Sequence, residues 1–413
     1  MSVVPPVVSR QPTLGEFLLL GSLTAFGAMT LDLYLPALPA IARDYAVPPA
    51  MVQMTMTAFF VGMALGQLVY GPVSDRIGRR PTIIFGCALY VVASLACAMA
   101  PDIEMMVLAR FVQALGCCSG MVVVRAVVRD RYDHRDSARI FSLFMLVLAV
   151  APLFAPALGS WLVLVMSWRA VFVALALFGL SLLVAVWFRL DESRSPQTAR
   201  TARSESVLAS YLDVLRQRRV IGYMLVGSAN GATLFAYIAT APDLVIESWG
   251  YSAWEFSLIF ALIAIGVIGS SQVNRWLLLH RTPDWVLGAS TLVSSGLGAL
   301  LLLIVSLGAP PVPVMVALAA VLASNGFIGG NAMAGALSID PLRAGTISGL
   351  LGAATFAMGA LSSAVAAALH DGTALPLAMT LLAALLMAAA SFYGLARPRP
   401  GHGPGGADRR HGD

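Results

Sequence analysis

Lysine is absent from this 413-residue sequence, and charged residues make up only 11% of it. Soluble domains carry about 25% charged residues, so the composition argues against a soluble protein. Its four cysteines (Cys87, Cys97, Cys117 and Cys118) lie in apolar stretches without C-x-x-C or His-linked spacing, which argues against disulfides and zinc sites. Since only five histidines occur as well, we expect neither a bound metal nor a cofactor.

Apolar residues, by contrast, make up 59% of the chain, and the mean hydropathy is +0.83. Apolar stretches of about 20 residues, long enough to cross a bilayer core of about 30 Å, recur from end to end. They predict an all-α membrane protein with twelve spans, at approximately 14–38, 50–71, 82–100, 105–128, 138–162, 168–188, 220–242, 253–273, 285–306, 312–336, 345–369 and 375–395.

The positions of the 26 arginines predict the orientation of these spans. With the N-terminus inside, 22 of them fall on cytoplasmic segments, Arg43 and Arg169 fall outside, and Arg110 and Arg125 lie within a span. This asymmetry follows the positive-inside rule and predicts that both termini are cytoplasmic. The net charge of +5 thus comes from arginines on the predicted cytoplasmic segments. We therefore expect a lipid bilayer rather than a nucleic acid as the partner.

A long polar interval divides the spans into two sets of six. We predict a six-span N-terminal half (1–190), a cytoplasmic linker (191–219) and a six-span C-terminal half (220–396). The linker segment "SVLASYLDVLRQ" has helical spacing and could lie along the inner membrane surface. Residues 397–413 form a Gly/Pro/Arg tail, which we expect to be disordered and cytoplasmic.

Asp32 and Arg110 are ionisable residues within predicted spans. Charged groups in a bilayer are costly and are functional candidates with a partner inside the bundle. Both residues fall about 10 Å from the outer ends of spans one and four at 1.5 Å per residue, so we expect them to meet. Alternatively, Asp32 caps a bend before Pro36 and Arg110 extends its charge to the membrane surface.

The loop "GPVSDRIGRRP" after span two combines turn-forming and charged residues. Gly71 and Gly78 allow tight turning, Asp75 can meet the positive end of the next helix, and Arg76, Arg79 and Arg80 hold the inner face. An ordinary positively charged loop would explain the arginines but not the ordered Gly/Asp/Gly spacing.

This loop, Gly71-x-x-x-Asp75-Arg76-x-Gly78-Arg79-Arg80, resembles the signature of the major facilitator superfamily. The sequence also resembles the antiporter branch, through "RFVQALGCC" in span four and "APLFAPALGS" in span five. The latter contains Pro152, Pro156 and Gly159, of which the prolines are expected to bend the helix. Two glycines of that motif are replaced here by Ala155 and Ser160.

Three further stretches, "DLYLPALPAI", "VVRDRY" and "NAMA", resemble the bicyclomycin-resistance (Bcr/CflA) drug efflux group, which includes amphenicol exporters. The resemblance implies a functional monomer in the bacterial inner membrane that exports small amphipathic drugs in exchange for protons. It implies that spans one and four line a central cavity where Asp32 and Arg110 couple proton movement to transport. It also implies that Asp130 joins Asp75, Arg76 and Arg79 or Arg80 in a gating network.

Polar and aromatic residues within apolar spans are candidates for binding an amphipathic substrate. They are Tyr34, Gln113, Asn230, Phe235, Tyr237 and Asn331. The two asparagines could instead bond to helix backbone or to a neighbouring span, and the aromatic residues could pack against lipid.

Two other classes of function fit less well or remain open. A membrane enzyme is disfavoured, because "DHRD" at 133–136 has no accompanying nucleotide loop or second catalytic constellation. An exporter of a metabolite such as an amino acid, or an uptake symporter, would share the same fold. The antiporter-type fifth span argues against uptake but does not identify the cargo.

Overall fold

The computed structural model describes residues 13–196, 198–200 and 206–397. The predicted tail and part of the linker therefore lie largely outside the described residues. Within the described ranges, long helices form a bundle without strands. The N-terminal elements are α1 (Leu14–Asp32), η1 (Leu35–Ala37), α2 (Leu38–Asp44), α3 (Pro49–Ile77), α4 (Arg79–Met99), α5 (Ile103–Arg131), α6 (His134–Val165) and α7 (Trp168–Arg189).

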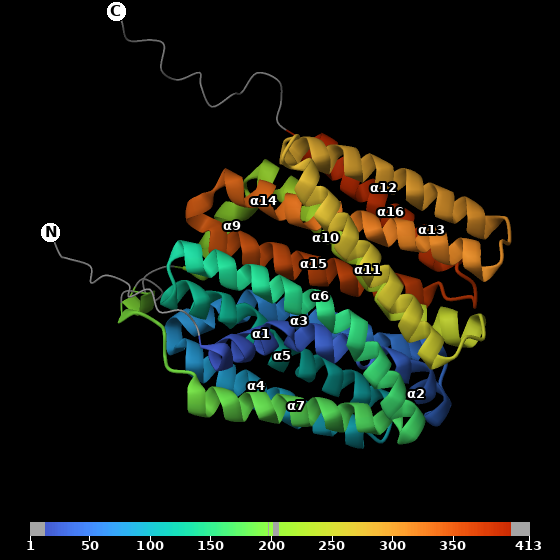
Figure 1. The fold of residues 1–413 in the computed structure, drawn as a ribbon, viewed down its shortest axis with the longest axis horizontal. Helices are drawn as coiled ribbons and strands as arrows, with labels where there is room; N and C mark the ends of the chain where they lie inside the picture. The colour runs from blue at the N-terminus through green and yellow to red at the C-terminus, as the bar shows by residue number, and fades with distance from the viewer. Residues whose placement is uncertain (1–12, 197, 201–205, 398–413) are drawn as a thin grey trace, which may run out of the picture.

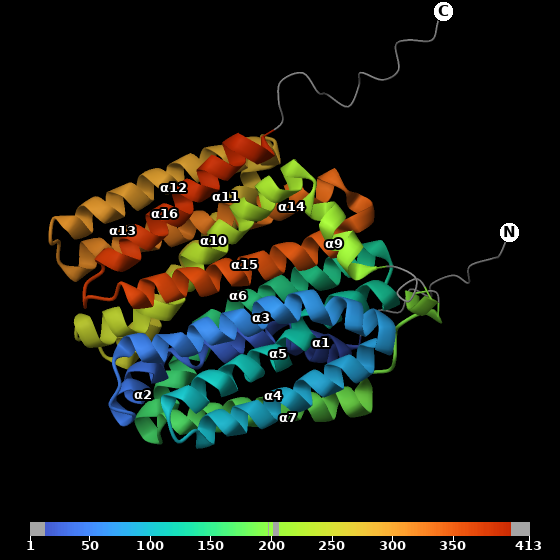
Figure 2. The ribbon, with the colours of Figure 1, turned by 180° about the vertical axis from the view of Figure 1, so that it is seen from behind.

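The remaining elements follow a short linker helix, α9 (Val207–Leu215). They are α10 (Arg218–Pro242), η2 (Asp243–Ser248), α11 (Ala253–Leu277), α12 (Pro283–Ser306), α13 (Pro311–Ser324), η3 (Asn325–Phe327), α14 (Gly329–Ile339), η4 (Pro341–Arg343), α15 (Ala344–Ala368), α16 (Leu375–Ser391) and η5 (Phe392–Ala396). Figures 1 and 2 show two groups of helices, α1–α7 and α10–α16, packed side by side.

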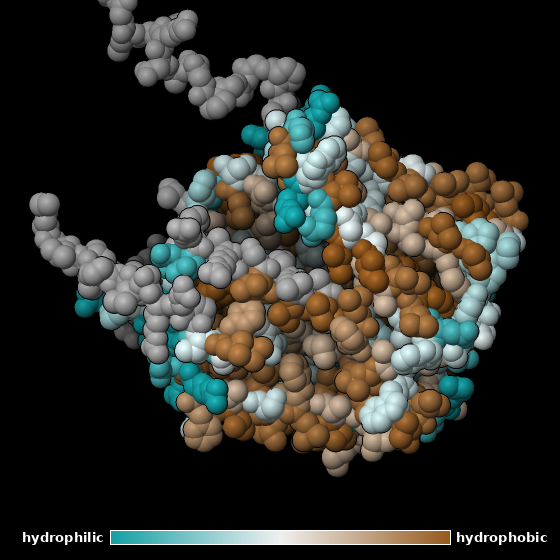
Figure 3. All heavy atoms as spheres, in the orientation of Figure 1, coloured by the Kyte–Doolittle hydropathy of each residue, from teal (hydrophilic) through white to brown (hydrophobic). Residues whose placement is uncertain are grey.

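Among the described residues, eleven helical segments are long and apolar enough to cross a membrane. The 32-residue helix α6, which contains the apolar segment Val150–Val165, supplies the twelfth crossing. Large apolar side chains are exposed on the outside of the bundle, including Phe85, Phe154 and Leu164. Figure 3 shows apolar residues over much of one face, as expected for a surface in contact with lipid chains. The all-α, twelve-span prediction is therefore confirmed.

Two spans are interrupted near their middle. Span one ends its first helix at Asp32 and continues through η1, which contains Pro36, into α2. Pro at this position prevents a regular helical hydrogen bond, so the break follows from the sequence. Span ten is broken at η3, where Asn325 and Gly326 interrupt the helix, and the sequence analysis did not predict this interruption.

The halves meet along two helix pairs. The first pair, α3 and α15, lies side by side, and Thr57 donates a hydrogen bond to Ser363 across the interface (3.1 Å). The second pair, α6 and α11, is joined through Ser160, whose Oγ lies 2.9 Å from the carbonyl oxygen of Ala253 and 2.8 Å from the Oγ of Ser257. In Figure 1, α6 and α11 converge at the right-hand end and diverge toward the left.

The two ends of the bundle differ in charge. We call the end that holds Glu16, Arg79, Arg131 and Arg219 the arginine-rich end, and the end that holds Asp44 and Asp102 the opposite end. At the arginine-rich end, Arg131 pairs with Glu16 at 2.5 Å, which joins the end of α5 to the start of α1. The halves touch through α6 and α11 at the opposite end, so the bundle is closed there.

Candidate functional site

Arg110 lies in α5 with its guanidinium fully buried among aromatic rings. The central guanidinium carbon lies 4.3 Å from the centre of the Tyr34 ring and 4.4 Å from that of Phe59. Desolvated cation–π contacts of this kind stabilise a guanidinium by about 2 kcal/mol. No carboxylate of the described residues pairs with Arg110 within 4.0 Å, so the rings and neutral polar groups hold its charge.

A short hydrogen-bond chain fixes the orientation of the Arg110 side chain. Arg110 donates to the Oε1 of Gln113 at 2.6 Å, and Gln113 donates to the Oγ of Ser94 at 2.7 Å. Ser94 in turn donates to the carbonyl of Tyr90, so the chain ends on the α4 backbone. The Nε of Arg110 is buried without a hydrogen-bond partner, so its N–H group is free to donate to another acceptor.

Asp32 is the last residue of α1 and is 4% exposed. No ion pair or side-chain hydrogen bond connects it to another described residue, and the expected contact with Arg110 is absent from this conformation. The prediction of a contact assumed that span one ends at Pro39, whereas the span continues to Asp44. Asp32 therefore lies about 18 Å from that end, against about 10 Å for Arg110 measured from Ile103.

The two residues nevertheless share one neighbourhood. Tyr34, two residues after Asp32, carries the ring on which Arg110 stacks, and its hydroxyl bonds to the Oγ1 of Thr55 at 2.7 Å. A small change in the segment that follows Asp32 would therefore move the aromatic surface that holds Arg110.

Gly159 of α6 approaches the backbone directly after Asp32. A Cβ atom at Gly159 would lie 2.2 Å from the carbonyl oxygen of Leu33, so this contact requires glycine. The next residue, Ser160, bonds to α11 of the other half. The serine that replaces a motif glycine thus makes a contact between halves, which the sequence analysis missed. Pro152 and Pro156 lie inside α6, as predicted, and their part in bending remains a prediction.

The structure brings Asp75, Arg79 and Asp130 together at the arginine-rich end. The Arg79 side chain is almost fully buried and pairs with Asp75 at 2.5 Å and with Asp130 at 2.9 Å. It also donates to the Oγ of Ser74 at 2.7 Å. This cluster joins α3, α4 and α5, as a gating network would require. Its gating role stays a prediction, as does that of Arg76, which lies exposed in the last turn of α3.

The prediction of a loop from Gly71 to Pro81 is wrong in its extent. Helix α3 continues to Ile77 and α4 begins at Arg79, so only Gly78 separates the two helices. Gly71 lies inside α3, and a Cβ atom there would meet nothing within 4 Å. Gly78 has a φ of +118°, a value that side chains with a Cβ rarely adopt.

Glu192, which the sequence analysis missed, meets the positive end of α4 in place of Asp75. Its carboxylate accepts hydrogen bonds from the backbone N–H groups of Arg79 (2.9 Å) and Arg80 (3.2 Å). Asp75, in the last turn of α3, instead forms an ion pair with the Arg79 side chain. An acidic residue in the arginine-rich segment just after span six was the available signal.

Arg194 and Arg80 add further hydrogen bonds near Glu192, where the linker meets α3 and α4. Partial burial alone would raise the pKa of Glu192, but backbone N–H groups of Arg194, Arg79, Arg80 and Ser193 donate to it and hold its pKa below the usual value. The Arg194 side chain donates to the carbonyl of Arg76. Arg80 donates to the carbonyl of Trp187 at 2.7 Å, which ties α4 to α7.

Three of the predicted substrate-binding residues already have protein partners. Tyr34 bonds to Thr55, and Gln113 bonds to Arg110 and Ser94. Asn331 donates to the Oδ1 of Asn274 at 2.9 Å and to the carbonyl of Phe327. In this conformation these side chains hold helices together, which is the alternative stated for Asn331.

The other three have surfaces or polar atoms without such partners. Phe235 lies between the halves, with its ring centre 4.5 Å from that of Phe60 and 5.1 Å from that of Phe356. The Oδ1 of Asn230 and the hydroxyl of Tyr237 are buried without hydrogen-bond partners. All three belong to α10, so this helix offers both an aromatic surface and unused polar groups to a guest.

The profile of the Major Facilitator Superfamily matches residues 18–367, which include both halves of the bundle. The chain belongs to the Major Facilitator Superfamily. It is therefore a transporter-family protein that spans the inner membrane several times, as its twelve helical crossings require.

Relatives of this major facilitator protein cover nearly its whole length. It is 30% identical over 388 residues to an uncharacterized MFS-type transporter, YdgK, of Bacillus subtilis, covering 93% of this chain and 96% of the relative. It is 30% identical over 378 residues to a bicyclomycin resistance protein homolog of Haemophilus influenzae, covering 91% and 94%. The predicted resemblance to the bicyclomycin-resistance group is confirmed.

A solved structure shows the same fold. The partially occluded inward-open xylose transporter XylE of E. coli superposes with a TM-score of 0.73 at 11% identity, covering 92% of this chain and 97% of that one. At this identity the likeness concerns the fold alone.

Proposed function

We propose that this major facilitator protein exports small amphipathic drugs in exchange for protons, as a monomer. The observation that carries the proposal is a carboxyl group, Asp32, buried at a break in a membrane-spanning helix without an ionic partner. A bicyclomycin resistance protein homolog matches the chain over nearly its whole length and supports drugs as the cargo. The arginine-rich end faces the cytoplasm in this scheme, in keeping with the positive-inside rule.

Asp32 is the group that exchanges protons. Its hydration and its distance from Arg110 change as the halves rock, so its affinity for a proton differs between the two orientations. Facing outward, Asp32 takes up a proton while the drug leaves; facing inward, it releases the proton and the cavity accepts another drug. Arg110 supplies the fixed positive charge, held in place by Tyr34, Phe59 and Gln113.

The membrane potential contributes when the exchange moves net charge. Each elementary charge that crosses is worth about 2.3 kcal/mol per 100 mV. Export of a neutral drug against one proton carries one positive charge inward and is driven by the potential as well as by the proton gradient.

The cluster of Asp75, Arg79 and Asp130 serves as the gate at the cytoplasmic end. Arg79 joins three helices of the N-terminal half, and Glu192 ties the linker to the same place. Rocking of the C-terminal half against this assembly changes access from that side, while the contact of Ser160 with α11 closes the other side. Phe235, Asn230 and Tyr237 on α10 are the groups we assign to the substrate.

The test is drug susceptibility in a bacterial host that lacks its own efflux pumps. Expression of the chain is expected to raise resistance to bicyclomycin or chloramphenicol, and a protonophore should cancel the effect. Asp32→Asn should abolish efflux at unchanged expression. Unchanged drug accumulation in Asp32→Asn cells would refute proton exchange by this residue. Resistance to no drug, together with export of a labelled metabolite, would favour a metabolite exporter instead.

A further inference from the structure

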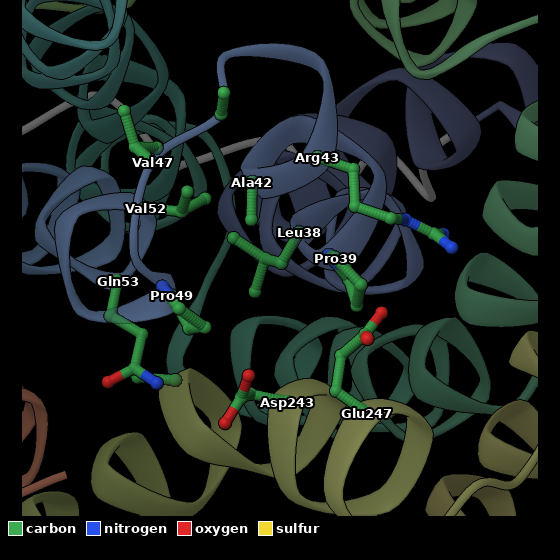
Figure 4. Close-up of a pocket in the computed structure, with 12 residues that line it drawn as sticks. Leu38, Pro39, Ala42, Arg43, Val47, Pro49, Val52, Gln53, Asp243 and Glu247 are labelled. Atoms are coloured by element: carbon green, nitrogen blue, oxygen red, sulfur yellow. The ribbon is translucent and has the colours of Figure 1, made fainter. Parts of the chain in front are cut away.

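A cavity of about 240 Å³ lies between the halves at the opposite end of the bundle. Its N-terminal wall comes from α2 and the start of α3 and is mostly apolar, with Leu38, Pro39 and Val52, but it also includes Arg43 and Gln53. Its C-terminal wall comes from η2 and carries the acidic side chains Asp243 and Glu247 (Figure 4). Pockets for drug-sized ligands measure about 300–1,000 Å³, so this smaller space suits a small molecule or one end of a larger one.

Gln53 points to a ligand in this cavity. The residue lines the cavity and is only 2% exposed, yet neither its Oε1 nor its Nε2 has a hydrogen-bond partner. An amide buried in this way costs about 1–3 kcal/mol per unpaired group, so a folded chain rarely retains one without a use. Figure 4 shows the side chain extending from α3 toward η2, which carries both carboxylates.

The charges around the cavity favour a cation. Asp243 is mostly buried, and its carboxylate lies 3.3 Å from the Nε2 of His370. Glu247 has no ion-pair partner within 4.0 Å among the described residues. Arg43 also lines the cavity, and Figure 4 shows its guanidinium beyond Pro39, on the side of Glu247 and away from Asp243. The two carboxylates of η2 thus face a wall that carries apolar side chains and the amide of Gln53, which suits an amine with a compact hydrocarbon body.

We propose that this cavity is a subsite for the cationic group of an exported substrate on the exit side of the transporter. The inference rests on the proposed export function and adds a substrate class, small organic cations. Asp243 and Glu247 attract the positive charge, the Oε1 of Gln53 accepts a hydrogen bond from a protonated amine or lies against a quaternary one, and Leu38, Pro39 and Val52 cover the hydrocarbon part. Opening of the halves at this end would then release the cation outward.

Equilibrium binding to the purified full chain in lipid nanodiscs tests the subsite, with radiolabelled benzyltrimethylammonium as the probe. Glu247→Gln should weaken binding about fivefold, the value of a partly exposed ion pair. Gln53→Leu should weaken it without lowering thermal stability, since the amide has no partner to lose. Glu104→Gln makes the same change in an exposed carboxylate outside the cavity and should bind like wild type. Neopentylbenzene, the neutral carbon analogue, should not compete.

Equal affinity of the wild type, Glu247→Gln and Gln53→Leu would overturn the subsite, and so would competition by the neutral analogue. Asp243→Asn provides a further variant, expected to weaken binding at least as much, and its folding is checked by thermal unfolding. Efflux of neutral chloramphenicol, measured in the same variants, separates the two proposals. If only the subsite proposal is wrong, the wild type still exports chloramphenicol. If the proposed export function is wrong, the wild type exports no drug.

Discussion

The guanidinium of Arg110 stacks 4.3 Å from the ring centre of Tyr34, and Tyr34 lies only two residues from Asp32. Asp32 and Arg110 are therefore connected through the chain segment that carries Tyr34 rather than by an ion pair. A change in the backbone between Asp32 and Tyr34 can move the ring on which Arg110 stacks while the two charges stay apart.

Replacing Arg110 by lysine should abolish most efflux. Lysine keeps the charge but has no planar guanidinium to lie on Tyr34 and Phe59 while bonding to Gln113. The loss of a stacked, desolvated contact is expected to cost about 2 kcal/mol. Drug accumulation in cells measures the effect. Arg169→Lys is the matched control, because Arg169 stacks on Trp168 at 4.1 Å but is exposed, and its efflux should stay near wild type.

Alanine substitutions at the two signature glycines should have opposite effects on stability. Gly78→Ala forces a Cβ into the left-handed region and to within 2.5 Å of the Glu192 carboxylate, and should cost about 1–3 kcal/mol. Gly71→Ala fills open space inside a helix and should add about 0.5–1 kcal/mol. A thiol-reactive dye can follow thermal unfolding, because all four cysteines are buried in the folded protein. Equal melting temperatures for the two variants would contradict this account of the loop.

Arg79→Ala should destabilise the protein strongly. It leaves Asp75 and Asp130, whose side chains are 37% and 17% exposed, unpaired next to each other, which should cost about 1–3 kcal/mol. The same dye assay measures the change. Arg80→Ala, which removes a more exposed arginine from the neighbouring position, should cost less than about 1 kcal/mol. Similar losses for both would mean that the buried cluster contributes little.

Glu192→Gln should lower stability by less than about 1 kcal/mol at neutral pH, since the carboxylate is partly exposed and screened. The pKa of Glu192 is lowered in the folded state, so its contribution is complete above the unfolded pKa of about 4.3. That contribution is lost as pH falls through the folded value. The difference in melting temperature between wild type and Glu192→Gln should therefore shrink below about pH 4. Asp191→Asn removes the neighbouring carboxylate and serves as the control variant.

A disulfide across the opposite end should stop transport reversibly. The Oγ atoms of Ser160 and Ser257 lie 2.8 Å apart, on α6 and α11, so cysteines placed there are close enough to join. Oxidation of the double variant Ser160→Cys/Ser257→Cys should reduce efflux to the level of cells without the transporter, and a reducing agent should restore it. Each single variant is the control. Continued efflux by the cross-linked protein would show that this end need not open.

The sequence predicts the span pattern and the charge cluster well, because both depend on local information. Apolar stretches of sufficient length define the crossings, and Asp75 and Arg79 are four residues apart, so their contact follows from helical spacing. The place of Asp130 in this cluster was predicted from the family resemblance, because its distance along the sequence from Asp75 and Arg79 gives no indication of a contact.

The remaining features depend on chain reversal and on packing between helices. Glu192 reaches α4 only because the chain turns back after α7, and Ser160 finds its partner 97 residues away. The error for Asp32 and Arg110 has a related origin, since Pro39 lies inside the first span, which ends only at Asp44. Hydropathy locates the crossing but does not say where the helix is interrupted.

Gly159 and Ser160 are covalent neighbours, yet one presses against the carbonyl of Leu33 and the other is bonded to the far half of the protein. Separating the halves at this end must pull on one peptide of α6 and thereby loosen the support of the backbone beside Asp32. In the proposed mechanism, this places the group that takes up the proton one residue of α6 away from the contact that holds the two halves together.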